Sequence, residues 1–199
     1  CSSVLATSPS FVEDIRKRTR NKDKVRYWPQ YAEDVYKPSK MKDYELVPND
    51  GRFKIVFTGN IGFAQGLEIL PKVARLVDDD VCFVIVGDGR YKKQLIEETH
   101  GVEDKFLFID RQPQEKIPSI LAACDVAFIS FMDNSLFKKT IPAKLQSYMA
   151  CGMPILAVAE GETKRIVEEA QCGVCCGFGN VENLADCIDR IKGQDLLRL

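Results

Sequence analysis

Short segments that are apolar throughout alternate, from Phe53 onward, with longer segments in which apolar residues recur every three or four positions. Uninterrupted apolar runs are typical of parallel strands that are buried on both faces. The predicted strands are Phe53–Thr58, Val81–Val86, Phe106–Ile109, Val126–Phe131, Ile155–Ala159 and 174–176. Helical periodicity follows each of them, with the closing helix at 181–192. This order predicts an α/β fold, a doubly wound, Rossmann-like parallel sheet of about six strands.

The first fifty residues are less regular. The residues Thr7-Ser8-Pro9-Ser10 are typical of a helix cap and predict a helix over Phe11–Arg18. A short strand is predicted at Val25–Pro29. Residues 37–52 are polar and rich in turn-forming residues, which indicates a linker. We therefore expect two parts, residues 1–50 and residues 51–199. Because the chain starts at Cys1 without a methionine, we also expect it to be a piece of a larger protein.

The composition excludes several classes of function. Hydrophobic residues make up 45% and charged residues 29% of the 199 positions, and the net charge is −1. Such a chain lacks the positive surface of a nucleic-acid-binding protein. No apolar run approaches the roughly 18 residues of a membrane-spanning helix. Cys172 and Cys175 form a C-x-x-C without a second pair, so we expect no metal site, and the scattered cysteines suit a reducing cytoplasm.

Candidate binding groups follow the predicted strands, because ligands of such folds bind at the carboxyl ends of the strands. The first strand leads into a glycine loop, Gly59 to Gly66, whose spacing does not fit the G-x-G-x-x-G dinucleotide fingerprint. Asp88 follows the second strand, where it could bind a ribose hydroxyl or cap the next helix, and we favour the cap. Arg111 follows the third strand and is either a site residue or a surface charge.

The segment from Thr140 to Gly152 has the features of a helix whose start binds phosphate. Pro142 suits a first helical turn, because its missing N–H would have no partner there. Gly152 suits the position just after the last turn. Thr140, Lys144 and Ser147 share one face of this helix, so a hydroxyl, free N–H groups and an ammonium would gather at its start. The alternative is a half-buried crossover helix with a solvated lysine.

This segment resembles the donor-site helix of retaining glycosyltransferases of the GT-B fold, of the group 1, family 4 type. The family commonly has P-S-K-x-x-E-Y-x-A-x-G-K-P-V, and this chain has Pro142-Ala143-Lys144-Leu145 followed by Tyr148-Met149-Ala150-Cys151-Gly152-Met153-Pro154-Ile155. The resemblance covers roughly residues 50–192. It implies that residues 51–199 are a nucleotide-sugar (donor) binding domain. Residues 1–50 would then be the end of the acceptor domain and the interdomain linker.

The resemblance also implies a set of donor-binding residues. They are Gly59, Asn60, Gly62, Arg111, Thr140, Ile141, Pro142, Lys144, Ser147 and Glu162. The chain departs from the family pattern at Asn60 and Gln65, where the family has a basic pair for the diphosphate, and at Lys139 and Ser147, where it has two glutamates. We therefore expect Lys144 to be the main cation for the donor diphosphate, and we assign no catalytic residue. Glu162 is either a sugar contact or an acid that favours a helix start.

The implied function belongs to a full-length enzyme of bacterial polysaccharide biosynthesis. It would transfer a sugar from a nucleotide sugar, which we expect to be UDP-linked, to a surface-polysaccharide or lipid-linked acceptor, with no metal or other cofactor. We expect a cytoplasmic protein, peripheral to the inner membrane in its full length, and no transferase activity from this chain without the missing amino-terminal acceptor domain. Three alternatives stay open: a sugar-nucleotide 2-epimerase of the same architecture, a nucleotide-binding domain without activity, and an NAD-binding module.

Overall fold

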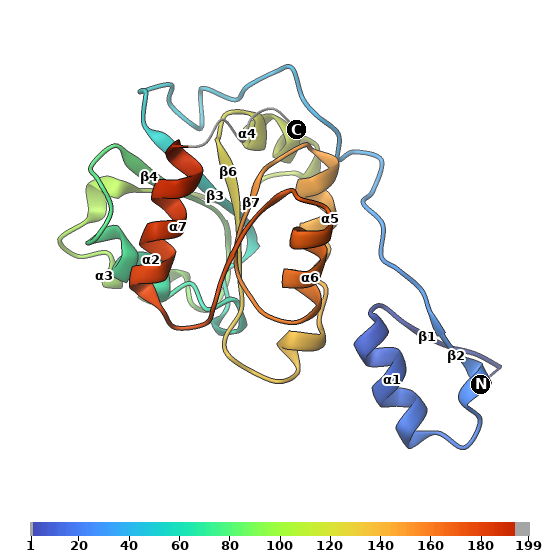
Figure 1. Cartoon of the computed structure of the whole chain (residues 1–199). Coiled ribbons are helices and arrows are strands. Elements are labelled where there is room, and N and C mark those ends of the chain that lie inside the picture. Colours follow the sequence, from blue (N-terminus) through green and yellow to red (C-terminus); the bar gives the residue numbers. More distant parts are fainter. Residues whose placement is uncertain (1, 194–199) are drawn as a thin grey trace.

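A six-stranded parallel sheet forms the centre of the computed structural model, which describes residues 2–193 (Figure 1). The strands are β3 (Phe53–Asn60), β4 (Val81–Asp88), β5 (Phe106–Ile109), β6 (Val126–Ser130), β7 (Ile155–Val158) and β8 (Gly173–Cys176). Their order across the sheet is β5-β4-β3-β6-β7-β8. The predicted fold class and all six predicted strands are confirmed. The end of the predicted second part, residues 194–199, lies outside the described residues.

Helices cover both faces of the sheet, and each face has its own apolar core. One core joins the sheet to α2 (Ile69–Ala74), α3 (Lys92–Glu98) and α7 (Val181–Gly193). The other joins it to α4 (Ile117–Ala122), α5 (Ala143–Ala150) and α6 (Glu162–Glu169). Short 3-10 turns lie at Lys22–Lys24, Phe63–Gln65, Glu103–Lys105, Gln114–Lys116 and Phe137–Lys139. Pro71 is the third residue of α2, in the first turn, where its missing N–H would have no acceptor within the helix.

The direction in which the chain adds strands to the sheet reverses between β3 and β6. The chain runs from β3 outward through β4 to β5, then returns to the other side of β3 and runs outward again through β6, β7 and β8. β3 pairs with β6 only at Ile55 and Val56, so the two strands separate toward their carboxyl ends. The N–H of Thr58 on β3 instead donates to the hydroxyl of the buried Tyr148 on α5, at 2.8 Å. This separation opens a crevice at the switch point of the topology, where ligands of doubly wound folds bind.

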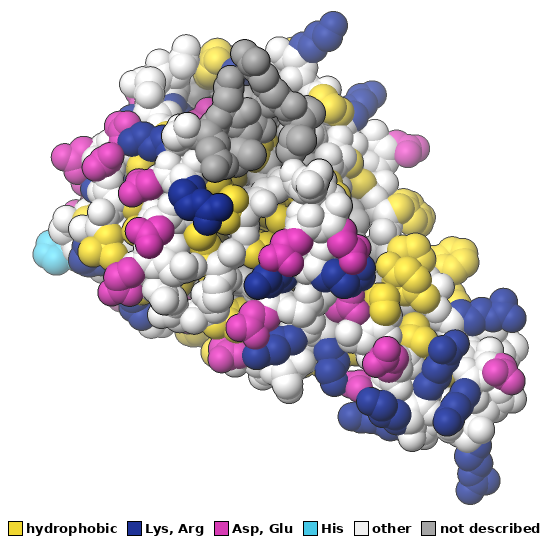
Figure 2. Space-filling model, viewed as in Figure 1, with side chains coloured by type: hydrophobic (Ala, Val, Ile, Leu, Met, Phe, Trp, Pro, Cys, Tyr) yellow, Lys and Arg dark blue, Asp and Glu magenta, His cyan; other side chains and the backbone are white. Residues whose placement is uncertain are grey.

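A small amino-terminal unit lies beside this domain (Figure 1). It consists of β1 (Val4–Ala6), α1 (Pro9–Arg18) and β2 (Val25–Tyr27), with the two strands paired in parallel. Ser8 caps α1, as predicted, by accepting a hydrogen bond from the N–H of Phe11. Figure 2 shows basic side chains gathered on this unit, including the last turn of α1. Among the described residues, no helix is long and apolar enough to cross a membrane.

The connection from residue 28 to residue 52 contains no helix or strand. It leaves β2, passes along the α5 side of the sheet and enters β3 (Figure 1). Tyr36, Leu46 and Val47 pack into the core on that side, and Val47 is fully buried. The connection is therefore fixed against the domain by its own apolar side chains.

Candidate functional site

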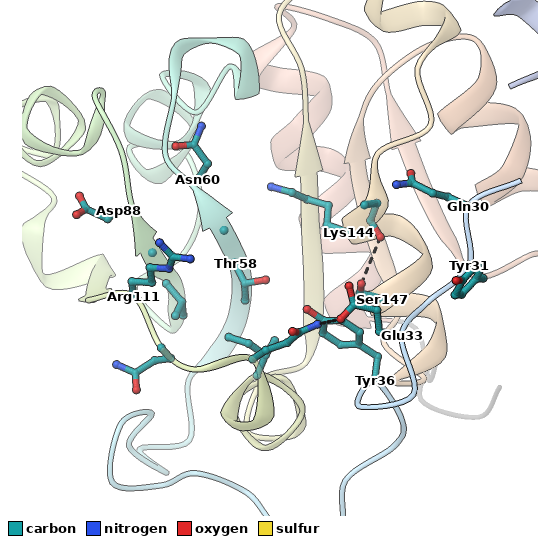
Figure 3. Close-up of a pocket in the computed structure, with 17 residues that line it drawn as sticks. Gln30, Tyr31, Glu33, Tyr36, Thr58, Asn60, Asp88, Arg111, Lys144 and Ser147 are labelled. Carbon is teal, nitrogen blue, oxygen red and sulfur yellow. Dashed lines mark hydrogen bonds between the residues drawn. The ribbon is translucent and has the colours of Figure 1, made fainter. Parts of the chain in front are cut away.

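A cavity of about 590 Å³ lies at the carboxyl ends of β3 and β4, facing the start of α5 (Figure 3). Its volume falls in the range of small-molecule binding sites, about 300–1,000 Å³. The predicted site residues that line it are Gly59, Asn60, Arg111, Lys144 and Ser147. The structure thus brings together residues from three segments of the chain, at the crevice that the sheet topology creates.

Lys144 extends from α5 across the cavity toward β3 (Figure 3). Its Nζ lies 3.6 Å from the centre of the Phe57 ring, and it would lie 3.8 Å from a Cβ atom placed on Gly59. Among the described residues, no carboxylate pairs with this ammonium. Burial removes water from the charged form and lowers the pKa of Lys144 to about 7. A half-buried ammonium without a counter-ion would bind an anion that enters the cavity, and the anion would restore its charge.

The first turn of α5 supplies further donors. The helix begins at Ala143, and Pro142 has an extended backbone with ψ 139° at the N-cap position. The predicted place of Pro142 in the first turn is therefore wrong by one residue: the fixed φ of proline is compatible with both positions, and the extended ψ places Pro142 just before the helix. The N–H groups of Ala143 and Lys144 have no acceptor within the helix. Both residues line the cavity, so these donors lie next to the ammonium.

The end of α5 agrees with the prediction. Gly152 has a φ of +72°, which glycine adopts without steric cost. Its N–H donates to the carbonyl of Met149 at 2.9 Å, and the N–H of Met153 donates to the carbonyl of Tyr148 at 3.0 Å. These two bonds form a Schellman motif that satisfies the last carbonyls of the helix.

The opposite wall of the cavity is made by the turns after β4 and β5. The exposed Arg111 adds a second cationic group, and Asp88 adds a carboxylate. Asp88 accepts a hydrogen bond from the N–H of Gly89 at 2.7 Å and does not cap α3, which begins four residues later at Lys92. The predicted cap is therefore wrong. Gly87 is required here, because a Cβ atom on it would lie 1.9 Å from the carbonyl oxygen of Gly59.

Five predicted site residues do not line the cavity. Gly62 precedes a 3-10 turn, and its N–H donates to the side chain of Gln65. The hydroxyl of Thr140 donates back to the carbonyl of Leu136. Ile141 is buried in the core, and Pro142 occupies the N-cap position of α5.

Glu162 is also placed elsewhere. Its carboxylate accepts hydrogen bonds from the N–H and the hydroxyl of Ser10, at 2.8 and 2.7 Å, and pairs with Arg165 at 2.8 Å. It therefore holds the amino-terminal unit to α6. Of its two predicted roles, the acid at a helix start fits the structure, because Glu162 is the first residue of α6, whereas the carboxylate does not line the cavity.

Several residues that line the cavity were not predicted from the sequence. Most conspicuous are four that come from the connection after β2: Gln30, Tyr31, Glu33 and Tyr36. Thr58 and the polar side chains of Gln112 and Gln114 were also missed. One feature of the sequence could have indicated the residues from the connection, namely the aromatic and amide side chains that follow Trp28. Solvated linkers contain few aromatic residues.

The sequence of this chain is similar to the sequences of glycosyltransferases. The chain is 33% identical over 155 residues to a probable glycosyltransferase, WbjE, of Pseudomonas aeruginosa, and 27% identical over 150 residues to the 2-deoxystreptamine glucosyltransferase of Streptomyces kanamyceticus. These alignments cover 75% and 73% of this chain, and the chain spans 38% of each relative.

The fold is shared with solved glycosyltransferases of the GT-B class. The structure of HepE from Anabaena in complex with UDP-glucose superimposes with a TM-score of 0.80, at 20% identity, over 97% of this chain and 54% of that one. The glycosyltransferase WaaG, involved in lipopolysaccharide biosynthesis, gives a TM-score of 0.75 at 15% identity, over 98% of this chain and 54% of that one. Residues 40–198 match the family of glycosyl transferases group 1. This chain belongs to that family.

Proposed function

We propose that this chain is the donor-binding half of a glycosyltransferase that transfers a sugar from a nucleotide sugar, UDP-linked, to a surface-polysaccharide or lipid-linked acceptor. Residues 51–199 would form the nucleotide-sugar binding domain. Residues 1–50 would be the end of the acceptor domain and the interdomain linker. Family membership supports the class of reaction, and the UDP and UDP-glucose complexes of HepE support the nucleotide.

The observation that carries the proposal is the unpaired ammonium of Lys144 at the start of α5. Glycosyl transfer from a nucleotide sugar leaves negative charge on the departing diphosphate. A cation, a helix N-terminus and free N–H groups stabilise that charge best where water is largely excluded. Lys144, the N–H groups of Ala143 and Lys144, and the close approach that Gly59 allows provide these groups at one end of the cavity.

The experiment that tests this placement is the substitution Lys144→Ala. We expect it to weaken UDP binding by about 1.5–3 kcal/mol, the range for a hydrogen bond to a charged group. Uridine has no phosphate, so its binding should change little. Titration calorimetry with both ligands measures the difference.

The matched control is Lys93→Ala, which removes an exposed lysine of α3 that does not line the cavity. It should leave both affinities unchanged. Equal loss of UDP and uridine affinity in Lys144→Ala, or no loss of either, would contradict the placement of the diphosphate.

The isolated chain should bind UDP weakly and transfer no sugar. Two reasons support this: the chain spans 38% of its curated relatives, and Asn60 and Gln65 lack the positive charge that the family pattern has at these positions. A sugar-transfer assay of the 199-residue chain with UDP-sugars tests the expectation, and measurable turnover would overturn it.

A nucleotide-binding domain without activity is the second candidate. Lys139 and Ser147 stand where the family pattern has glutamates, and Lys139 pairs with Asp14 of the amino-terminal unit instead of lining the cavity. Absence of turnover in a full-length protein that binds UDP would favour this candidate.

A further inference from the structure

The cavity has a second polar end, one helical turn along α5 from Lys144. Ser147 lies there, three residues after Lys144 and therefore about 4.5 Å further along the helix axis. Glu33 of the connection and Gln114 line the same cavity. In Figure 3 the side chain of Glu33 lies by Ser147, whereas Lys144 points away from both, toward β3.

The acceptors at this end are largely unused. The carboxylate of Glu33 accepts a hydrogen bond from the side-chain amide of Gln114. No lysine, arginine or histidine among the described residues forms an ion pair with it. A carboxylate has about four acceptor positions, so most of them remain open. The hydroxyl of Ser147 donates to the carbonyl of Ala143 at 3.3 Å, which leaves its oxygen able to accept as well.

The two ends of the cavity therefore carry opposite charges. The Lys144 end attracts an anion. The Glu33 end repels anions and attracts neutral groups that donate hydrogen bonds, such as hydroxyls. In a nucleoside diphosphate, the ribose with its two adjacent hydroxyls directly follows the phosphate that is attached to it. The spacing of one helical turn between Lys144 and Ser147 suits this arrangement.

We propose that Glu33, held in place by Gln114, binds the 2′ and 3′ hydroxyls of the nucleotide ribose. This inference rests on the proposed function, because Lys144 fixes the diphosphate at the other end. The connection would then supply a carboxylate that α5 does not have, since its residue at this point is Ser147. Glu33 is a determinant of specificity for ribonucleotides in this assignment.

The test compares UDP with 2′,3′-dideoxy-UDP, by titration calorimetry on the whole chain. The wild type should bind UDP about tenfold or more tightly, as expected for hydrogen bonds to a charged acceptor. Glu33→Ala should bind the two ligands equally, through weaker UDP binding, with 2′,3′-dideoxy-UDP bound as in the wild type or more tightly. Glu33→Gln, which keeps the length but loses the charge, should show an intermediate preference.

Asp34→Ala is the matched control, because it removes an exposed carboxylate from the same connection without altering the cavity wall. It should keep the wild-type preference. Glu33 is exposed, so its substitution should leave the thermal unfolding curve unchanged.

Three results would overturn the inference. If the wild type binds UDP and 2′,3′-dideoxy-UDP equally, the hydroxyls are not bound, although the proposed function still stands. If the preference persists in Glu33→Ala, another group binds them. If the wild type binds neither nucleotide, the proposed function fails and the inference fails with it.

Discussion

At the scale of single residues, Lys144 couples ligand binding to protonation. Burial lowers its pKa to about 7, from an ordinary value of 10.5. Above pH 7 the free site is therefore mostly neutral, and a bound diphosphate would favour the charged form and raise the pKa again. UDP binding at pH 8 should then take up a large fraction of one proton, and affinity should fall as pH rises from about 7 toward 10. Calorimetry at pH 8 in two buffers of different ionisation enthalpy measures the uptake.

Lys144→Arg supplies the control for this prediction. Arginine stays charged over the whole range, so this variant should bind UDP without proton uptake from residue 144. A phosphate with a pKa near 6 is already ionised at pH 8 and adds little uptake of its own. Equal proton uptake in the wild type and in Lys144→Arg would show that Lys144 is not the group that titrates.

At the scale of elements, the contact between β3 and α5 sets the width of the site. β3 leaves β6 after Val56, and the N–H of Thr58 is satisfied by the hydroxyl of Tyr148. The substitution Tyr148→Phe keeps the ring in the core and removes that acceptor. It should lower the free energy of unfolding by about 1–3 kcal/mol, the cost of leaving a buried donor unsatisfied. Denaturant unfolding measures the change.

Tyr44→Phe is the matched control, because Tyr44 is 45% exposed and loss of its hydroxyl leaves no buried donor without a partner. Its unfolding free energy should stay within about 0.5 kcal/mol of the wild type. If Tyr148→Phe is no more destabilising than Tyr44→Phe, the hydroxyl of Tyr148 does not hold β3 at this point.

The elements were predictable from the sequence, and the site was predictable only in part. Apolar runs are a local signal, so they located all six strands of the sheet, and Gly152 located the end of α5. The start of α5 was one residue off, because Pro142 is compatible with both neighbouring positions. The positions of Glu33 and Glu162 in the structure could not be predicted from local sequence patterns. Their places depend on contacts with Gln114 and Ser10, which are distant in the sequence.

At the scale of the whole molecule, one side of the cavity depends on how the amino-terminal unit is attached. The connection that carries Tyr31 and Glu33 to the cavity starts from this unit (Figure 1). The unit is held by Ser8, whose hydroxyl donates to the carbonyl of Lys139 at 2.6 Å, by the ion pair of Asp14 with Lys139, and by Ser10 on Glu162. The anchors on α6 and on the segment before α5 thus fix the start of the connection.

Glu162 is a buried anchor, with 5% of its surface exposed. Burial raises the pKa of its carboxyl, but the hydrogen bonds from Ser10 and Arg165 outweigh burial and leave the pKa below its ordinary value. The carboxylate is therefore charged and strongly bonded at neutral pH, where the unit is attached.

Removal of this carboxylate should loosen the amino-terminal unit without unfolding the sheet. In Glu162→Ala, the amides of α1 should exchange with solvent about tenfold faster, since two hydrogen bonds to a charged group are lost. Those of β4, whose residues are almost all buried, should exchange as in the wild type. Hydrogen exchange followed by mass spectrometry resolves the two regions. Glu169→Ala is the control, because Glu169 lies on the same helix and pairs with Arg165 but does not contact Ser10. Equal acceleration of α1 in both variants, or acceleration of β4 together with α1, would mean that Glu162 supports α6 and not the attachment of the unit.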